Sequence, residues 1–264
     1  LRGGKIASFG GEFARFMRKP AQLDALLQAG FRVDGKAREG NDSVGFAPLS
    51  APMPAGDDAQ RAAIAAAVAP AGVATTTVLL NEGLTGDEGG KPRLLNVTAA
   101  LRDRISALPA DASVGLWTFN KVDSGAAVQT GPLGEQLGPQ PRSAALTGVL
   151  NSTTPTSGGG VSFTTVRAAL ADAVANYRPG QPNSILVITQ GPHTDQTLDA
   201  QGLQDAVRGA LDPNRPVVIN VIDFGGDPDK PTWEAVAKLS GGGYQEIATS
   251  DSPDLAAAIT RWVP

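Results

Sequence analysis

The chain has 264 residues, a net charge of −4 and a pI near 5.1, with 41% hydrophobic and 5% aromatic residues. This length allows one large domain, or one medium domain with part of another, around a core of Ala, Val, Leu and Ile. The acidic balance argues against nucleic-acid binding, which needs a basic surface to displace counterions. No apolar run approaches the roughly 20 residues that span a bilayer, and the lack of cysteine excludes disulfides, thiolate metal sites and a cysteine nucleophile.

The sequence pattern of residues 1–46 predicts a compact helical segment. Apolar and small residues follow helical spacing from Phe9 to Met17. Pro20 then restarts the chain at the first position of a second helix, and Gly30 is the expected cap at the end of that helix.

From about residue 74, strands and helices alternate, which predicts a doubly wound, mostly parallel α/β sheet with helices on both faces. A Pro- and Ala-rich linker with one helix, residues 47–73, precedes this domain of residues 74–264. The expected strands are 75–80, 113–119, 126–130, 184–189, 216–223 and 244–247. The expected helices are 93–107, 141–150, 164–177, 200–210, 231–239 and 252–262.

Two of the predicted strands end in neutral amides. Asn81 follows the first strand, Gln190 follows the strand at 184–189, and a loop containing glycine comes after each. Ligands bind beyond the carboxyl ends of the strands in an open α/β sheet. We therefore expect the two amides to lie near each other and to decide what this edge binds.

Several separated motifs in the same order resemble a von Willebrand factor A domain, and the resemblance covers residues 74–264. They are Thr75-Thr-Thr-Val-Leu-Leu-Asn-Glu-Gly-Leu-Thr85, Ser113-Val-Gly-Leu-Trp-Thr-Phe119, Asn183-Ser-Ile-Leu-Val-Ile-Thr-Gln-Gly191 and Ala237-Lys-Leu-Ser-Gly-Gly-Gly-Tyr244. The resemblance implies the same α/β fold. It also implies a metal-ion-dependent adhesion site, in which an Asp-x-Ser-x-Ser loop, a Thr and the Asp of a Thr-Asp-Gly motif hold a divalent cation.

This chain departs from the family's metal-binding motifs. The first motif reads Asn81-Glu-Gly83-Leu-Thr85, so only Thr85 keeps a hydroxyl, and Gln190 replaces the last Asp. Hard cations such as Mg²⁺ prefer carboxylate oxygens, which offset the cost of dehydrating the ion. We expect a degenerate site with no metal and no other cofactor.

The middle loop supplies the remaining candidates. Ser162 and Thr164 carry hydroxyls, but Val161 could equally occupy the position of the family's Thr. Asp87 and Glu88 lie nearby and could help to rebuild a metal site. We expect both instead to be solvated loop charges, which are favourable ahead of the helix at 93.

Residues 1–46 are similar to the tail of an extracellular solute-binding domain, through Phe13-Ala-Arg-Phe-Met-Arg-Lys-Pro-Ala-Gln and Ala29-Gly-Phe31-Arg. The two resemblances together imply a secreted actinobacterial protein that joins both domains, of which this chain would be the C-terminal part. Because the chain begins with Leu1, we expect a targeting segment upstream. The expected location is extracytoplasmic, secreted or anchored to the bacterial cell envelope by a segment outside this chain.

Three other patterns suggest catalysis or nucleotide binding only weakly. Residues 85–92 resemble a phosphate loop, but Thr85 replaces its first Gly, Pro92 replaces its Ser or Thr, and two acidic residues would repel phosphate. His193 is the only histidine, and no Gly-x-Ser-x-Gly motif supplies a nucleophile for it, so we expect it to be exposed and inert. The glycine clusters at 158–160 and 241–243 are expected to form tight turns with positive φ.

We expect no catalytic residues and a non-enzymatic module that binds an envelope protein or a glycan. The expected partner-binding residues are Asn81, Gly83, Thr85, Ser162 and Gln190. Three alternatives stay open from the sequence: a scaffold that relays solute binding within a transport-related receptor, a surface that only packs against its own upstream solute-binding domain, and a hydrolase or nucleotide-dependent enzyme.

Overall fold

The computed structural model describes residues 19–28 and 73–264, and the chain divides into two compact units, Leu1–Ala67 and Val68–Pro264. The second unit holds every described strand and all described helices except α2. Within the described ranges, no helix is both long and apolar enough to cross a membrane.

The helix α2 (Pro20–Gln28) belongs to the first unit and begins at a proline. Proline suits the first turn of a helix because its φ is already fixed and its missing N–H would have no partner there. The predicted start at Pro20 is therefore confirmed. The expected helix at 9–17, the Gly30 cap and the linker at 47–72 lie outside the described residues.

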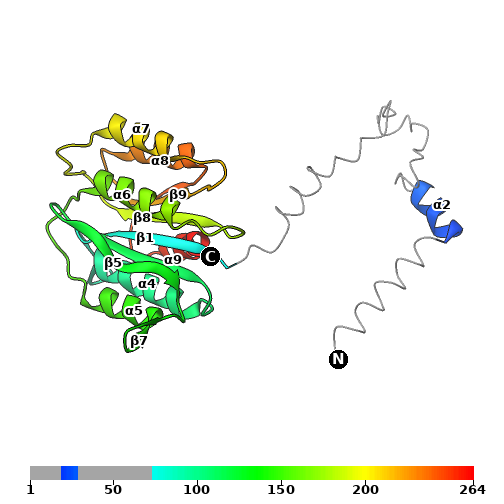
Figure 1. Cartoon of the computed structure of the whole chain (residues 1–264), viewed down its shortest axis with the longest axis horizontal. Coiled ribbons are helices and arrows are strands. Elements are labelled where there is room, and N and C mark those ends of the chain that lie inside the picture. Colours follow the sequence, from blue (N-terminus) through cyan, green and yellow to red (C-terminus); the bar gives the residue numbers. More distant parts are fainter. Residues whose placement is uncertain (1–18, 29–72) are drawn as a thin grey trace. The chain divides into compact units, whose positions relative to one another are not determined.

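The second unit is built on a six-stranded sheet with the strand order β10-β9-β8-β1-β4-β5 (Figure 1). All neighbouring strands are parallel except β5, which runs antiparallel to β4. The strands are β1 (Thr75–Asn81), β4 (Ser113–Phe119), β5 (Ser124–Pro132), β8 (Asn183–Thr189), β9 (Val218–Phe224) and β10 (Tyr244–Ile247). Because the chain leaves β1 for β4 on one side and later reaches β8 on the other, the crevice at the carboxyl end of β1 is a topological switch point.

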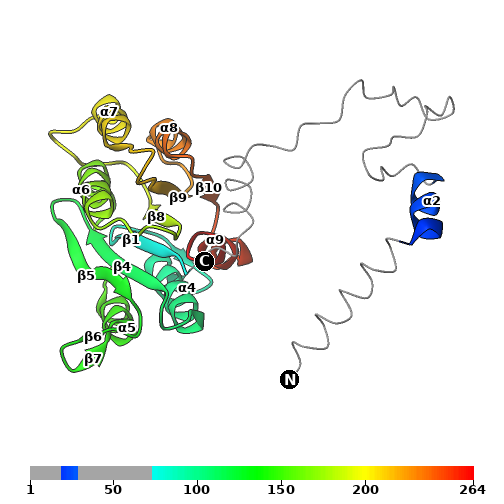
Figure 2. The same ribbon diagram turned by 45° about the vertical axis from the view of Figure 1, so that its right-hand side comes forward.

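Helices cover both faces of the sheet: α4, α5 and α9 one face, and α6, α7 and α8 the other (Figures 1 and 2). Their bounds are α4 (Arg93–Ala107), α5 (Arg142–Ser152), α6 (Ser162–Ala175), α7 (Ala200–Ala210), α8 (Lys230–Ser240) and α9 (Pro253–Trp262). Each face has its own core, with Leu94 and Ile259 on the first and Phe163 and Trp233 on the second. This confirms the predicted doubly wound, mostly parallel α/β fold.

Two short hairpins were not expected from the sequence. They are β2 (Asp87–Glu88) with β3 (Lys91–Pro92), and β6 (Gln136–Leu137) with β7 (Gln140–Pro141). Each strand is only two residues long, which is too short for the alternation of apolar and polar residues that predicts a strand. The first hairpin occupies the segment that resembled a phosphate loop, which therefore has a different backbone shape.

The glycine clusters serve close packing as much as turning. Gly159 and Gly241 have the expected positive φ, +88° and +80°. Gly160 and Gly242 do not; an added Cβ would lie 2.7 Å from a Phe119 ring carbon at the first and 2.0 Å from a backbone oxygen of β9 at the second. At these two positions glycine allows one segment of backbone to approach its neighbour.

The central strand β8 offers a direct test of the core. Val187 is fully buried there, so Val187→Ala should lower the free energy of unfolding by about 2–3 kcal/mol through lost burial and the cavity left behind. Val122, which is 77% exposed, provides the matched control, and Val122→Ala should change stability by less than about 0.5 kcal/mol. Urea unfolding measures both; similar losses would contradict the assigned burial.

Candidate functional site

The carboxyl ends of β1 and β8 meet, and this brings the two predicted amides together. Asn81 is fully buried at the end of β1. Its Oδ1 accepts a hydrogen bond from the backbone N–H of Gly83 at 2.7 Å, and its Nδ2 donates to the backbone carbonyl of Gln190 at 3.2 Å. Its Oδ1 therefore fixes the loop that follows β1, and its Nδ2 joins the end of β1 to the end of β8.

The side chain of Gln190 is held by three contacts. Its Oε1 accepts from the backbone N–H of Thr85 at 3.0 Å and from Nη1 of Arg93 at 2.8 Å. Its Nε2 lies 3.4 Å from the hydroxyl of Thr85. Asn81, Gly83, Thr85 and Gln190 thus form one connected group, which we call the amide edge.

Arg93, the first residue of α4, places a positively charged guanidinium beside Gln190. Its guanidinium forms an ion pair with Glu88 and lies over the ring of Phe224, with Cζ 4.9 Å from the ring centroid. Both charged side chains are only 12% exposed. A fixed internal guanidinium therefore lies beside Gln190, at the strand end where the resemblance in the sequence implied a divalent cation.

The expectation that Glu88 is a solvated loop charge was wrong. Besides Arg93, its carboxylate accepts a hydrogen bond from the backbone N–H of Ser250. The hydrogen bonds from Arg93, followed by those from Ser250, lower the pKa of Glu88 to about 2 although burial opposes the shift. Asp87, in contrast, is exposed as expected.

Steric packing closes the position of the family's first serine. A Cβ added to Gly83 would lie 2.5 Å from the backbone oxygen of Gly159 and 3.0 Å from that of Ser157. A serine could fit only if the backbone of residues 157–160 withdrew.

The donor set does not fit a divalent cation. The amide edge contains no carboxylate, and the oxygen of Gln190 already faces a guanidinium. Among the described residues, no three His, Cys, Asp or Glu side chains are arranged to hold a metal ion. Hard cations need several anionic oxygens, so the residues present disagree with the family's metal site.

The middle loop contributes less than the sequence suggested. Ser162 is buried in the first turn of α6, and in the part of the chain that the structure describes no hydrogen bond joins it to the amide edge. The backbone N–H groups of Phe163 and Thr164 donate instead to the carboxylate of Asp195, at 3.0 and 2.8 Å. Asp195 thereby satisfies the free N–H groups at the start of α6, where a negative charge is favourable.

His193 is less exposed than expected and has no nucleophile to activate. Its ring stacks on Phe163 with the centroids 4.0 Å apart, and its side chain is 25% exposed. Asp195 lies 3.6 Å from Nδ1, too far for a hydrogen bond. No serine or threonine hydroxyl in the described residues is hydrogen-bonded to this imidazole, so no catalytic triad forms.

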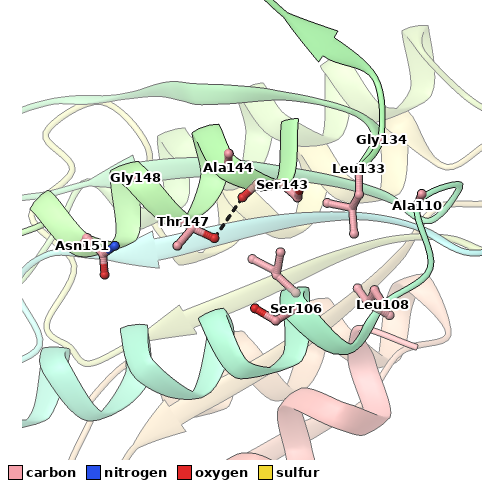
Figure 3. Close-up of a pocket in the computed structure, with 11 residues that line it drawn as sticks. Ser106, Leu108, Ala110, Leu133, Gly134, Ser143, Ala144, Thr147, Gly148 and Asn151 are labelled. Atoms are coloured by element: carbon pink, nitrogen blue, oxygen red, sulfur yellow. Dashed lines mark hydrogen bonds between the residues drawn. The ribbon is translucent and has the colours of Figure 1, made fainter. Parts of the chain in front are cut away.

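A separate groove of about 520 Å³ lies between α4 and α5 (Figure 3). Ser106 and Leu108 line it from one side, and Ser143, Thr147 and Asn151 line it from the other. None of the predicted site residues lines this groove.

The Arg93–Glu88 pair predicts a specific acid sensitivity. Because folding lowers the pKa of Glu88 from 4.5 to about 2, its contribution to stability is complete above pH 4.5 and is lost as the pH falls towards 2. We expect this loss to be about 2–3 kcal/mol, because a fall in pKa from 4.5 to about 2 is worth about 3 kcal/mol and solvent screens part of it. Glu88→Gln should remove this part of the pH dependence in urea unfolding, whereas Glu234→Gln, at an exposed position of α8, should retain it. Equal acid profiles for the wild type and Glu88→Gln would contradict the assignment.

The chain is similar in sequence to known bacterial proteins. No family model matches the chain. The uncharacterized proteins MT1884 and Rv1836c of Mycobacterium tuberculosis, from strains CDC 1551 and H37Rv, are each 51% identical to it over 249 residues. The match covers 94% of this chain and 37% of each relative, so the chain spans just over a third of the length of the curated relatives it matches.

Solved structures with a similar backbone include a von Willebrand factor type A protein from Catenulispora acidiphila, with a TM-score of 0.52 at 14% identity over 71% of this chain and 42% of that one. The von Willebrand A domain of SpRpn10 matches with a TM-score of 0.51 at 13% identity, over 72% of this chain and 95% of that domain. The pilus adhesin SpaC from Lactobacillus rhamnosus GG matches with a TM-score of 0.51 at 13% identity, over 72% and 30%. At these identities the similarity concerns the backbone alone, and it shows that the second unit of this chain has the von Willebrand A fold.

Proposed function

We propose that this chain is a non-enzymatic binding module of the bacterial cell envelope, which binds a protein or glycan partner at the amide edge without a metal ion. The observation that carries the proposal is the contact between Arg93 and Gln190. Where the family would place a cation between the domain and its partner, this chain has its own guanidinium, held by Glu88. The edge therefore keeps its shape without an ion.

The exposed groups around the amide edge favour recognition of a macromolecule. Thr85 and Gly86 are exposed beside Gln190, and Lys121 and Val122 are exposed at the turn between β4 and β5. The hydroxyl of Thr194 donates to the carbonyl of Lys121 at 2.8 Å, so this turn is fixed to the loop after β8. Several fixed loops at one sheet edge form a preorganised surface, which loses little entropy when it binds.

The bacterial relatives and the pilus adhesin with a similar fold support an extracytoplasmic place for this module. They do not identify its partner. The lack of an activated nucleophile beside His193 favours binding over catalysis.

A relay role within a larger solute-binding receptor is the second candidate. Two observations favour it: the chain spans 37% of its relatives, and every polar atom of Asn81 and Gln190 has a partner within the chain. In that role the edge would support the fold, and another part of the protein would bind the solute. Solute-dependent thermal stabilisation of the full-length protein that is missing from this chain would favour the relay.

The metal-free character predicts the outcome of a calorimetric titration. Mg²⁺ or Mn²⁺ should release no heat beyond that of dilution in the wild type at concentrations up to about 1 mM, where even weak protein sites bind these ions. Arg93→Met combined with Gln190→Asp should bind these ions better than Gln190→Asp alone, because the guanidinium that competes for the new carboxylate is gone. Micromolar binding by the wild type that is lost in Gln190→Ala would overturn the metal-free proposal.

Site-specific photo-crosslinking tests the binding surface itself. A photoreactive phenylalanine analogue at Thr85 should give a discrete adduct with an envelope component, and EDTA should leave the yield unchanged. The same analogue at Arg167, an exposed position of α6, is the matched control and should give no such adduct. Excess unlabelled wild-type chain should compete for this adduct. An adduct that needs Mg²⁺, or equal adducts from both positions, would contradict the proposal.

A further inference from the structure

A cluster of acidic side chains lies at the carboxyl end of β9, outside the amide edge. Asp223 is 1% exposed on β9, and Asp227 is 9% exposed on the loop that leads to α8. One oxygen of Asp223 accepts from the hydroxyl of Tyr244 at 2.8 Å, and its other oxygen, Oδ1, is buried without a hydrogen-bond donor. A buried carboxylate oxygen without a donor is costly, and a proton is the smallest partner that removes the cost.

Asp227 supplies the acceptor for that proton. Its two oxygens already accept from the backbone N–H of Asp229 at 2.7 Å and from Nε1 of Trp233 at 3.2 Å. Burial raises the pKa of Asp227 as well, and these donors oppose that shift. Burial of two neighbouring carboxyl groups thus favours one proton on the pair. Burial and then the charge of Asp227 raise the pKa of Asp223 to about 7.

The same loop is in contact with the loop that follows Gln190. A Cβ added to Gly191 would lie 1.8 Å from Oδ1 of Asp227, so this carboxylate lies directly against the Gly191 backbone. The backbone N–H of His193 donates to Oδ2 of Asp229 at 2.6 Å. The loop at 225–229 therefore supports the loop at 190–195.

We propose that Asp223 and Asp227 share one proton, and that this proton latches the loop at 225–229 against the loop at 190–195. When Asp223 loses the proton, two negative charges lie side by side in a buried position. Gly225 and Gly226 are exposed, and Gly226 has a φ of +85°, so the loop can turn at this point and carry Asp227 towards solvent. The loop next to Gln190 then loses its support above the titration midpoint.

The other charged groups around Asp223 do not supply a neutralising partner. Tyr244 and Glu246 face it from β10, and Lys230 from the start of α8 is engaged by Glu246 at 2.6 Å. Asp229 adds a further negative charge beside Asp227. Since Lys230 is already paired with Glu246, a proton on Asp223 is what neutralises the charge of this carboxylate.

The test follows the backbone amides of Gly191 and His193 by NMR in the full 264-residue chain between pH 5 and pH 8.5. Both amides should titrate with a midpoint of about 7 in the wild type and show no such transition in Asp223→Asn, whose amide mimics the protonated acid. Above the midpoint, hydrogen-exchange protection of the His193 amide should fall about tenfold per pH unit in the wild type and stay constant in Asp223→Asn. His193→Gln should leave the Gly191 transition in place, which separates Asp223 from the imidazole.

Two further variants keep the test decisive if Asp223→Asn does not fold. Tyr244→Phe removes the hydroxyl that favours the ionised form of Asp223, so it should move the Gly191 midpoint upward. Asp254→Asn, at an exposed position of α9, is the matched control and should leave the midpoint unchanged. A Gly191 transition that disappears in His193→Gln, or that Tyr244→Phe does not move, would overturn the latch.

Discussion

The contact of the Arg93 guanidinium with Gln190 and Glu88 is the constraint on which the amide edge depends. It places a permanent positive charge at the carboxyl end of β1 and β8, where a parallel sheet with helices on both faces concentrates the free ends of its strands. A chelator cannot remove this charge, because it belongs to a side chain and not to a bound ion. Arginine also stays charged at all accessible pH values. Its neutralisation by Glu88 leaves an edge that is polar and rigid.

Much of the fold could be predicted from the sequence. The near-continuous apolar runs of β8 and β9 are typical of strands buried on both faces, and both are interior strands of the sheet. The proximity of Asn81 and Gln190 followed from the rule that parallel strands end at the same edge. The burial of Trp233 could not be predicted in this way: its ring packs against Phe163 and its N–H reaches Asp227, and both contacts depend on tertiary packing.

The side-chain pairing of the site could not be predicted in the same way. Glu88 ends the first strand of a short hairpin, Arg93 directly follows the second strand, and no periodic pattern marks such a pair. Ser162 was predicted from its register in a glycine-rich loop. The position of that loop depends on its close approach to Gly83 and on the contact of Gly160 with the ring of Phe119. The partner of a carboxylate is decided by tertiary packing, which a single sequence does not display. The roles of Asp195 and Asp223 remained hidden for the same reason.

The close approach of the 157–160 backbone to Gly83 makes the departure from ion coordination hard to reverse. A serine at position 83 alone would collide with two carbonyl groups, and an aspartate at position 81 alone would lose the amide that bridges to β8. An aspartate at position 190 alone would be neutralised by the neighbouring arginine. Each single replacement is penalised by a different contact, so only a concerted set of changes could place a cation at this edge.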